Sequence, residues 1–179
     1  MSTMKTYIVL LRGVTPVGKN KLPMAQLREV LSNDGFDKVR TYIQSGNALV
    51  DTELPASRIG KRVHELIEKH IGPDLVVVVR TRTEMQNVLY GNPFQKDHDI
   101  SRVFFVLFAQ KPSVDRVAEL LTRDFGNEKL AIAKNAAYMY IPGTYGRGKL
   151  SNNYLEKQLG ISATMRNFNT ISKLIDISK

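Results

Sequence analysis

The apolar positions in the first half of the chain follow two periods. Runs of apolar and β-branched residues are typical of strands, whereas apolar residues three and four positions apart are typical of amphipathic helices. A ribbon of extended character is interrupted by Ser45-Gly46-Asn47, which indicates a β-hairpin. The expected elements are a strand at 6–11, a helix at 23–35, the hairpin ribbon at 38–52, a helix at 55–72 and a strand at 74–79.

The second half repeats this order. Its expected elements are a strand at 102–108, a helix at 112–126, a hairpin ribbon at 129–142, a helix at 149–160, a strand at 163–166 and a final helix at 171–178. Two pairs of segments also match in letters: "LIEKHIG" (66–72) parallels "YLEKQLG" (154–160), and "VVRTRTEMQNVL" (78–89) parallels "TMRNFNTISKLI" (164–175). Because the shift is about 86–90 residues throughout, we infer an internal duplication.

The order β-α-β-β-α-β is that of the ferredoxin-like unit. The sequence therefore predicts an α+β protein made of two tandem ferredoxin-like subdomains from an internal duplication. We expect them to pack together, because each is small for independent folding. The first subdomain is expected at 1–90 and the second, with the C-terminal helix, at 102–179. The polar segment 91–101 contains Pro93 and no periodicity, so we expect a linker there.

Composition narrows the class of protein. The chain has 179 residues, of which 42% are hydrophobic, and it has no cysteine, which excludes disulfide scaffolds and thiol catalysis. No stretch approaches the ~18 consecutive apolar residues of a membrane span, so we expect a cytoplasmic protein without a membrane partner. The net charge of +9 favours an anionic partner, either nucleic acid or a phosphorylated small molecule. The alternative is that the positive charge only makes the surface generally basic and serves no particular partner. The sequence does not indicate an oligomeric state.

The loop that begins at Gly13 has the glycine and lysine spacing of a Walker A phosphate loop, Gly13-x-x-x-x-Gly18-Lys19. Asn20, however, replaces the Ser or Thr whose hydroxyl would hold Mg²⁺. Pro16 removes one backbone N–H from the loop. The hairpins also imply an antiparallel sheet, not the parallel sheet of P-loop enzymes. We therefore do not expect an NTPase.

The same loop is cationic and directly precedes a predicted helix. A helix N-terminus has free N–H groups and a positive dipole end, so it favours an anion. In a β-α-β-β-α-β unit this loop lies at the same end of the sheet as the hairpin turn. The candidate ligand-binding residues at this end are Arg12, Lys19, Asn20, Lys21, Gln44, Ser45 and Asn47. The alternative is that the glycines and Asn20 only shape and cap the loop.

Several motifs match a known family. They are Leu10-Leu11-Arg12-Gly13, Asn20-Lys21, Pro23-Met24, Thr41 through Asn47, Gly146 through Leu150, Leu155-Glu156, Leu159-Gly160 and Thr164 through Thr170. In these motifs the chain resembles the bacterial family known as domain of unknown function 1697. The resemblance implies two ferredoxin-like subdomains and no assigned activity. The chain departs from the family pattern at 14–18, where "VTPVG" stands in place of "INVGG", so that one glycine and one asparagine are lost and a proline is gained. Milder departures are Gly148, which replaces Ser, and Phe168, which replaces Trp.

A second polar cluster lies near the C-terminal end, in "YGRGKLSNNY" (145–154) and "RNFNT" (166–170). Arginine and asparagine side chains around an aromatic ring suit phosphate and base contacts. The alternative is structural: Asn169 or Thr170 would cap the final helix, as Thr83 would cap its duplicate. The candidate ligand-binding residues here are Arg147, Lys149, Arg166, Asn167 and Asn169.

Signals for other chemistry are sparse. Tyr138 and Tyr140 alternate onto one face of a predicted strand, which fits an RNA-stacking platform or packing between the subdomains. The RNA-recognition signature itself is absent. His64 and Glu68 have metal-ligand spacing on a helix but lack a third ligand, so we expect no metal and no cofactor. No residue pattern indicates catalysis.

Three functions are compatible with these observations. The first, which we expect, is a non-enzymatic binding protein for an anionic ligand. The second is an enzyme acting on a nucleotide or phosphorylated substrate, with 44–47 and 166–170 forming a shared site. The third is a structural or partner-binding module in which the polar motifs are only caps and turns.

Overall fold

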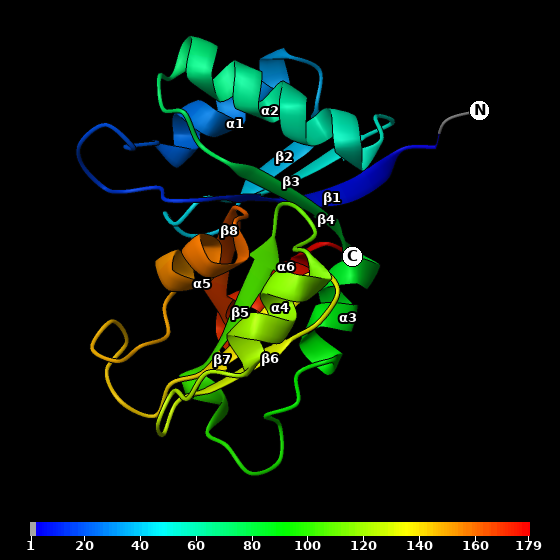
Figure 1. Cartoon of the computed structure of the whole chain (residues 1–179). Coiled ribbons are helices and arrows are strands. Elements are labelled where there is room, and N and C mark those ends of the chain that lie inside the picture. Colours follow the sequence, from blue (N-terminus) through cyan, green and yellow to red (C-terminus); the bar gives the residue numbers. More distant parts are fainter. Residues whose placement is uncertain (1–2) are drawn as a thin grey trace. The chain divides into compact units, whose positions relative to one another are not determined.

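The computed structural model describes residues 3–179, and the chain divides into two compact units (Figure 1). The first unit is Met1–Met85 together with Leu174–Lys179, and the second is Gln86–Lys173. The segment 91–101 lies within the second unit.

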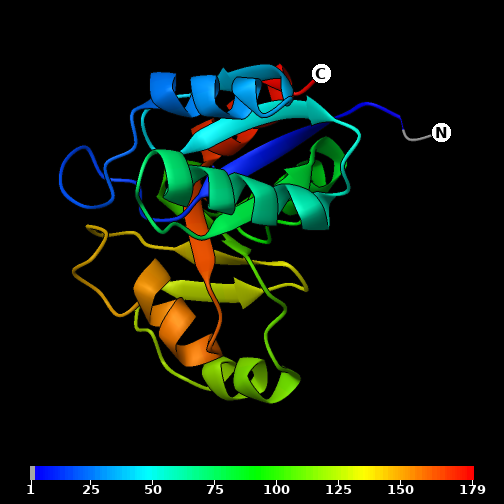
Figure 2. The ribbon, with the colours of Figure 1, turned by 90° about the horizontal axis from the view of Figure 1, so that it is seen from above.

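The first unit is a four-stranded antiparallel sheet with two helices on one face, as Figures 1 and 2 show. The strand order is β2-β3-β1-β4, which is the order of a ferredoxin-like unit. Its elements are β1 (Lys5–Leu11), α1 (Met24–Asn33), β2 (Asp37–Thr41), β3 (Asn47–Thr52), α2 (Ala56–His70), β4 (Val77–Thr81) and the first residues of α3 (Arg82–Tyr90).

The second unit has the same topology, with strand order β6-β7-β5-β8 and α4 and α5 packed together. Its elements after α3 are η1 (Ile100–Arg102), β5 (Val103–Phe108), α4 (Val114–Leu121), β6 (Lys129–Ile132), β7 (Ala136–Tyr140), α5 (Asn152–Leu159), β8 (Ala163–Asn167) and the first part of α6 (Phe168–Ile177). The predicted α+β class with two tandem ferredoxin-like units is confirmed.

The core of the first unit follows directly from the sequence periods. On α2, Ile59, Val63 and Ile67 recur every four residues and are fully buried. They pack with Val9 and Leu11, which alternate on β1. The apolar stripe of α2 is thus buried against the face of β1 that carries Val9 and Leu11, and the helices and the sheet form a two-layer core.

Two helix starts differ from the prediction. Thr81 and Glu84 cap α3 reciprocally: Glu84 N donates to Thr81 Oγ1 at 3.2 Å, and Thr81 N donates to Glu84 Oε2 at 2.7 Å. Asn167 Oδ1 accepts from Thr170 N at 2.9 Å and caps α6. The predicted caps, Thr83 for α3 and Asn169 or Thr170 for α6, are wrong because both helices begin two or more residues earlier than the apolar spacing indicates.

Within residues 3–179, none of the helices is both long and apolar enough to cross a membrane.

Candidate functional site

The loop between β1 and α1 is closed by its own hydrogen bonds. Asn20 Nδ2 donates to Gly13 O at 3.2 Å, Thr15 N donates to Asn20 O at 3.1 Å, and Lys21 N donates to Gly18 O at 3.1 Å. Gly13 and Gly18 adopt φ angles of 80° and 83°, which favour glycine. Two of the backbone N–H groups that a phosphate-wrapping loop would offer are thus already used, which agrees with the rejection of a Walker A loop.

The loop lies beside the β2–β3 turn, as the topology predicted. Leu11 N donates to Gly46 O at 2.8 Å. Gly46 has a φ angle of 83°, and a Cβ atom there would lie 2.8 Å from Val14 Cγ2 and 2.9 Å from Leu11 Cβ. Only glycine lets the turn approach the loop this closely.

The polar side chains of the turn are mainly structural. Asn47 is fully buried, and its Nδ2 donates to Tyr42 O at 3.1 Å and to Ser45 Oγ at 3.0 Å. Asn47 and Ser45 therefore hold the hairpin closed. Gln44 is exposed, and no hydrogen bond of its side chain is found in the part of the chain that the structure describes.

Beyond the closed loop, Lys19 and Lys21 line a shallow polar depression of about 360 Å³. Gly18, Pro23, Gln26 and the turn at 71–73 complete its lining. Both lysines are exposed, and within residues 3–179 neither ammonium group has an ion pair or hydrogen bond to a protein acceptor. The depression is therefore bordered by two cations without a countercharge.

The first turn of α1 borders the same depression. Its N-cap residue is Pro23, whose side chain supplies no acceptor, and the first turn holds no acidic residue. The uncapped N–H groups and the dipole of α1 add positive partial charge on the side where Lys21 lies. Gln26 is tied to the opposite rim, since its Nε2 donates to His70 O at 3.4 Å.

Arg12 differs from the two lysines. Its side chain is half-buried, its backbone N donates to Val76 O at 3.0 Å, and it makes further interactions within the protein. Arg12 is thus part of the folded framework, and the exposed charge at this end of the sheet comes from Lys19 and Lys21.

In the second unit, the loop at 143–149 is fixed from several sides. Lys149 Nζ donates to Asp124 O at 2.9 Å, and the Glu128 carboxylate accepts from the backbone N of Lys149 and of Leu150, both at 2.9 Å. Arg147 is exposed at the loop tip. Of the two cations predicted for a site here, Lys149 is engaged in holding the loop and Arg147 points its charge to solvent without a described protein partner.

The residues of β8 and the start of α6 also serve structure. Arg166 is buried, and its guanidinium donates to Thr164 Oγ1 at 2.7 Å and to Met165 O at 2.8 Å. Burial lowers the pKa of Arg166 to about 10, so it stays charged at neutral pH. Asn167 is the N-cap of α6, and Asn169 is exposed.

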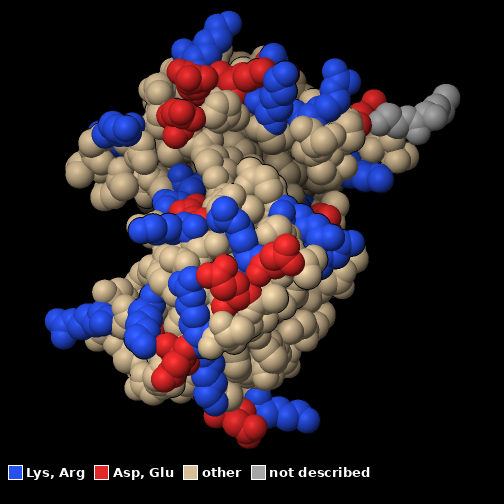
Figure 3. Space-filling model, viewed as in Figure 1, with Lys and Arg blue, Asp and Glu red and all other residues tan. Residues whose placement is uncertain are grey.

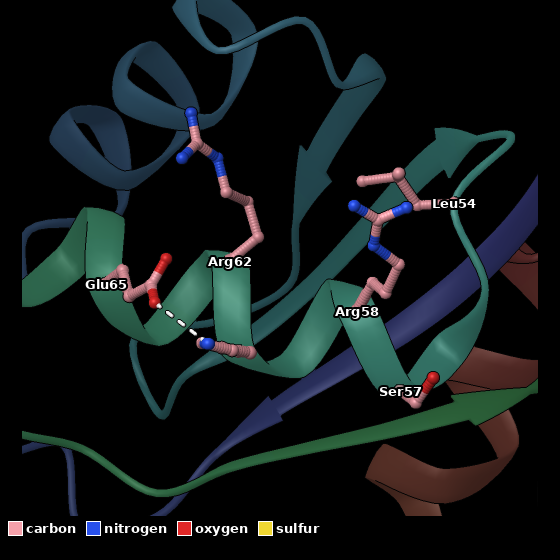
Figure 4. Close-up of a pocket in the computed structure, with 6 residues that line it drawn as sticks. Leu54, Ser57, Arg58, Arg62 and Glu65 are labelled. Atoms are coloured by element: carbon pink, nitrogen blue, oxygen red, sulfur yellow. Dashed lines mark ion pairs between the residues drawn. The ribbon is translucent and has the colours of Figure 1, made fainter.

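A basic groove on α2 was not predicted (Figure 4). It has a volume of about 430 Å³ and is lined by Leu54, Ser57, Arg58, Lys61, Arg62 and Glu65. Arg62 reaches toward α1 and pairs with Asp34, which raises the pKa of Arg62, and Lys61 pairs with Glu65 at 3.8 Å. The spacing of these charged residues on α2 did not indicate a binding site in the sequence, because charged residues on a helix surface are usually solvated.

Charge is otherwise dispersed. Figure 3 shows lysine and arginine side chains scattered over much of the visible face, with aspartate and glutamate side chains among them. The net charge of +9 therefore does not by itself locate a site on this face.

The predicted tyrosine platform is wrong for Tyr138. This side chain is 3% exposed, and its hydroxyl donates to Val88 O at 2.8 Å, so no base can stack on it. Tyr140 is half-buried against His98, with ring centroids 4.5 Å apart. The alternation of residues along β7 correctly predicted that Tyr138 and Tyr140 share one face of the strand. It did not predict that α3 and the segment after it cover that face.

His64 is held by neighbouring groups. Its Nδ1 lies 2.9 Å from Leu75 O, and its Nε2 lies 3.8 Å from Glu68 and 3.7 Å from Asp74. Among the described residues, no group of three or more histidine, cysteine, aspartate or glutamate side chains is arranged to hold a metal ion.

The comparisons with known proteins agree with this fold. No curated protein matches the sequence. The structure is similar to that of a conserved bacterial protein from Streptococcus pneumoniae, with a TM-score of 0.74 and 24% identity over 99% of this chain and 100% of the other. At that identity the likeness shows the fold alone. The model of the family described as "Protein of unknown function (DUF1697)" matches residues 4–138, which include the loop and turn described above but not the motifs at 146–170. The chain therefore belongs to the DUF1697 family of proteins of unknown function.

Proposed function

We propose that this protein binds a phosphate-bearing anion, and that the phosphate occupies the depression beside Lys19 and Lys21. The observation that carries the proposal is the convergence of these two unpaired lysines with the uncapped first turn of α1 around one polar depression.

The electrostatics of the depression favour an anion over a cation or a neutral ligand. Each lysine contributes a full charge, and the N-terminus of α1 contributes roughly half a charge by its dipole. Glutamate and aspartate are absent from its lining, so no countercharge neutralises them there. Lysine acts as a mobile point charge, which suits a phosphate group that can approach from solvent.

The shape of the depression favours a ligand that exposes its phosphate on a surface. It is open and shallow, and a free phosphate would stay largely hydrated in it. A nucleic-acid backbone or the phosphate of a larger metabolite fits this description, because binding then depends on contacts elsewhere and on counterion release.

A second candidate function is favoured by the amide side chains of the family motifs. Asn20, Asn47 and Asn167 each hydrogen-bond backbone groups nearby. These contacts support a structural or partner-binding module in which the motifs shape loops and cap a helix.

The test is a salt titration of oligonucleotide binding. A labelled single-stranded oligonucleotide is titrated with protein at a series of salt concentrations that begins at ~50 mM. Phosphate contacts contribute most to the affinity at the lowest salt concentration. In the double variant Lys19→Gln/Lys21→Gln, affinity should fall and the slope of log K against log salt should decrease by about 1.4, since each single-strand phosphate contact contributes ~0.7. Competition with pyrophosphate distinguishes a small phosphorylated ligand from a nucleic acid.

The matched control is Lys134→Gln/Lys157→Gln, which removes the same charge from exposed positions of the second unit. It should leave the slope unchanged. An equal loss in both double variants would assign binding to diffuse charge, and absence of any salt-dependent binding of oligonucleotide or pyrophosphate would end the proposal in favour of the structural module.

A further inference from the structure

The second unit contains a cavity of about 280 Å³ that shares no residue with the anion site. It lies where the end of α3, the segment that follows it, η1 and the start of α6 meet. Its lining residues are Leu89, Tyr90, Asn92, Gln95, Ile100 and Phe168, none of which is charged. The cavity therefore suits a neutral group and not a phosphate.

The wall formed by the end of α3 is closely packed. Tyr138 Oη donates to Val88 O at 2.8 Å and joins α3 to β7. Gly91 lies so close that a Cβ atom there would be 2.9 Å from both Tyr138 Oη and Asn87 O. The end of α3 is therefore packed closely against β7 on this side of the cavity.

Two aromatic rings flank the cavity. Tyr90 is 71% exposed, although it is a large aromatic residue at the end of a helix. Phe168 is half-buried at the start of α6. Exposed rings beside a cavity offer faces on which a planar ligand can stack.

Asn92 supplies a hydrogen-bond donor whose orientation is fixed. The residue is 4% exposed, and its Oδ1 accepts from Phe94 N at 3.0 Å. This bond determines which amide atom is oxygen and which is nitrogen. The buried Nδ2 has no hydrogen-bond partner, and an unpaired buried donor is unfavourable until an acceptor reaches it.

Gln95 supplies the complementary acceptor. Its Nε2 donates to Tyr90 O at 3.0 Å, so its Oε1 is the atom left to accept a hydrogen bond. The cavity is thus lined by one amide donor, one amide acceptor and two aromatic rings, which are the groups that recognise the polar edge and the face of a nucleobase.

We infer that this cavity binds a planar nitrogen heterocycle of the nucleobase class. The ring stacks against Tyr90 and Phe168, a ring carbonyl or ring nitrogen accepts from Asn92 Nδ2, and a ring N–H donates to Gln95 Oε1. This inference goes beyond the proposed phosphate site and does not depend on it, because the cavity would bind a neutral heterocycle that carries no phosphate.

The test uses the full chain and the four neutral nucleosides adenosine, guanosine, cytidine and uridine, which carry no phosphate. Binding is followed by calorimetry, with indole as a planar probe that lacks the acceptor. At least one nucleoside should bind saturably and more tightly than indole. Asn92→Asp keeps the Oδ1 acceptor for the backbone N–H of Phe94 and replaces the Nδ2 donor by an oxygen. The affinity for that nucleoside should therefore fall by about tenfold or more.

The matched control is Asn87→Asp, which makes the same change at an exposed position of α3 and should bind as the parent does. Tyr90→Ala removes an exposed ring, so it should fold normally and lose about tenfold of the affinity. If the Asn92→Asp variant does not fold, the nucleoside affinity of the Tyr90→Ala variant tests the inference. Absence of saturable nucleoside binding, indole binding equal to the best nucleoside, or unchanged affinity in Tyr90→Ala would overturn the inference.

Discussion

The carboxylate of Glu128 occupies the space into which residue 148 would project a side chain. A Cβ atom built on Gly148 would overlap the Glu128 carboxylate, and that carboxylate is fixed by the backbone N–H groups of Lys149 and Leu150 at 2.9 Å. The position of the buried Glu128 side chain therefore favours glycine at residue 148.

Gly148→Ala should destabilise the protein by about 1–3 kcal/mol, because Glu128 must move and release two backbone donors. Urea unfolding of the variant measures the change. Gly143→Ala is the matched control, since nothing lies within 4 Å of a Cβ atom at Gly143 and its φ angle is not positive. Equal stability of the two variants would show that Glu128 has free space into which it can move.

Asn47→Ala should destabilise the first unit by about 1–3 kcal/mol. The substitution removes the hydrogen bonds from Asn47 Nδ2 to Tyr42 O and Ser45 Oγ and opens a gap at a fully buried position. Gln44→Ala, at an exposed position three residues earlier, should change stability by less than about 0.5 kcal/mol. Unfolding curves of the two variants compare a turn residue that holds the fold with one that is available for a ligand.

The fold could be predicted from the sequence because its elements are strongly periodic and occur twice. Element ends were harder to predict. The run of valines at 76–79 has no alternation that marks where pairing with β1 begins, and the strand in fact runs from Val77 to Thr81. Local periodicity reports which face of an element is apolar, whereas a strand end depends on the neighbouring strand.

The candidate sites were predicted only in part. The closeness of the β1–α1 loop and the hairpin turn follows from topology alone, and it is observed. The roles of single polar residues do not follow, because an asparagine that closes a loop, such as Asn20, has the same letter as one that binds a ligand. The cavity beside Asn92 could not be predicted, since it forms only where the stretch 89–100 meets Phe168, which is far away in the sequence.

The two threonines of "RTRTEM" give a direct test of the helix start. Thr81→Ala should cost about 1 kcal/mol, because Thr81 Oγ1 accepts from Glu84 N at 3.2 Å, whereas Thr83→Ala should change stability by less than about 0.5 kcal/mol. Glu84→Ala should cost about 0.5–1 kcal/mol even after Thr81 is replaced, because the backbone N of residue 81 still donates to Glu84 Oε2 at 2.7 Å. A Glu84→Ala variant as stable as its parent in both backgrounds would contradict the reciprocal cap.

Tyr138 should make stability depend on alkaline pH. Burial raises the pKa of its hydroxyl above the ordinary value of 10, so the folded state keeps this proton where the unfolded state has lost it. Its contribution is fully present below about pH 10 and is lost as the pH rises through the folded-state pKa. Tyr138→Phe should lose about 1 kcal/mol at neutral pH, because the bond to Val88 O is gone, and should fall less steeply above about pH 10. Urea unfolding of both proteins from neutral to alkaline pH measures this difference. Parallel pH curves would show that the hydroxyl ionises as easily in the folded chain as in the unfolded one.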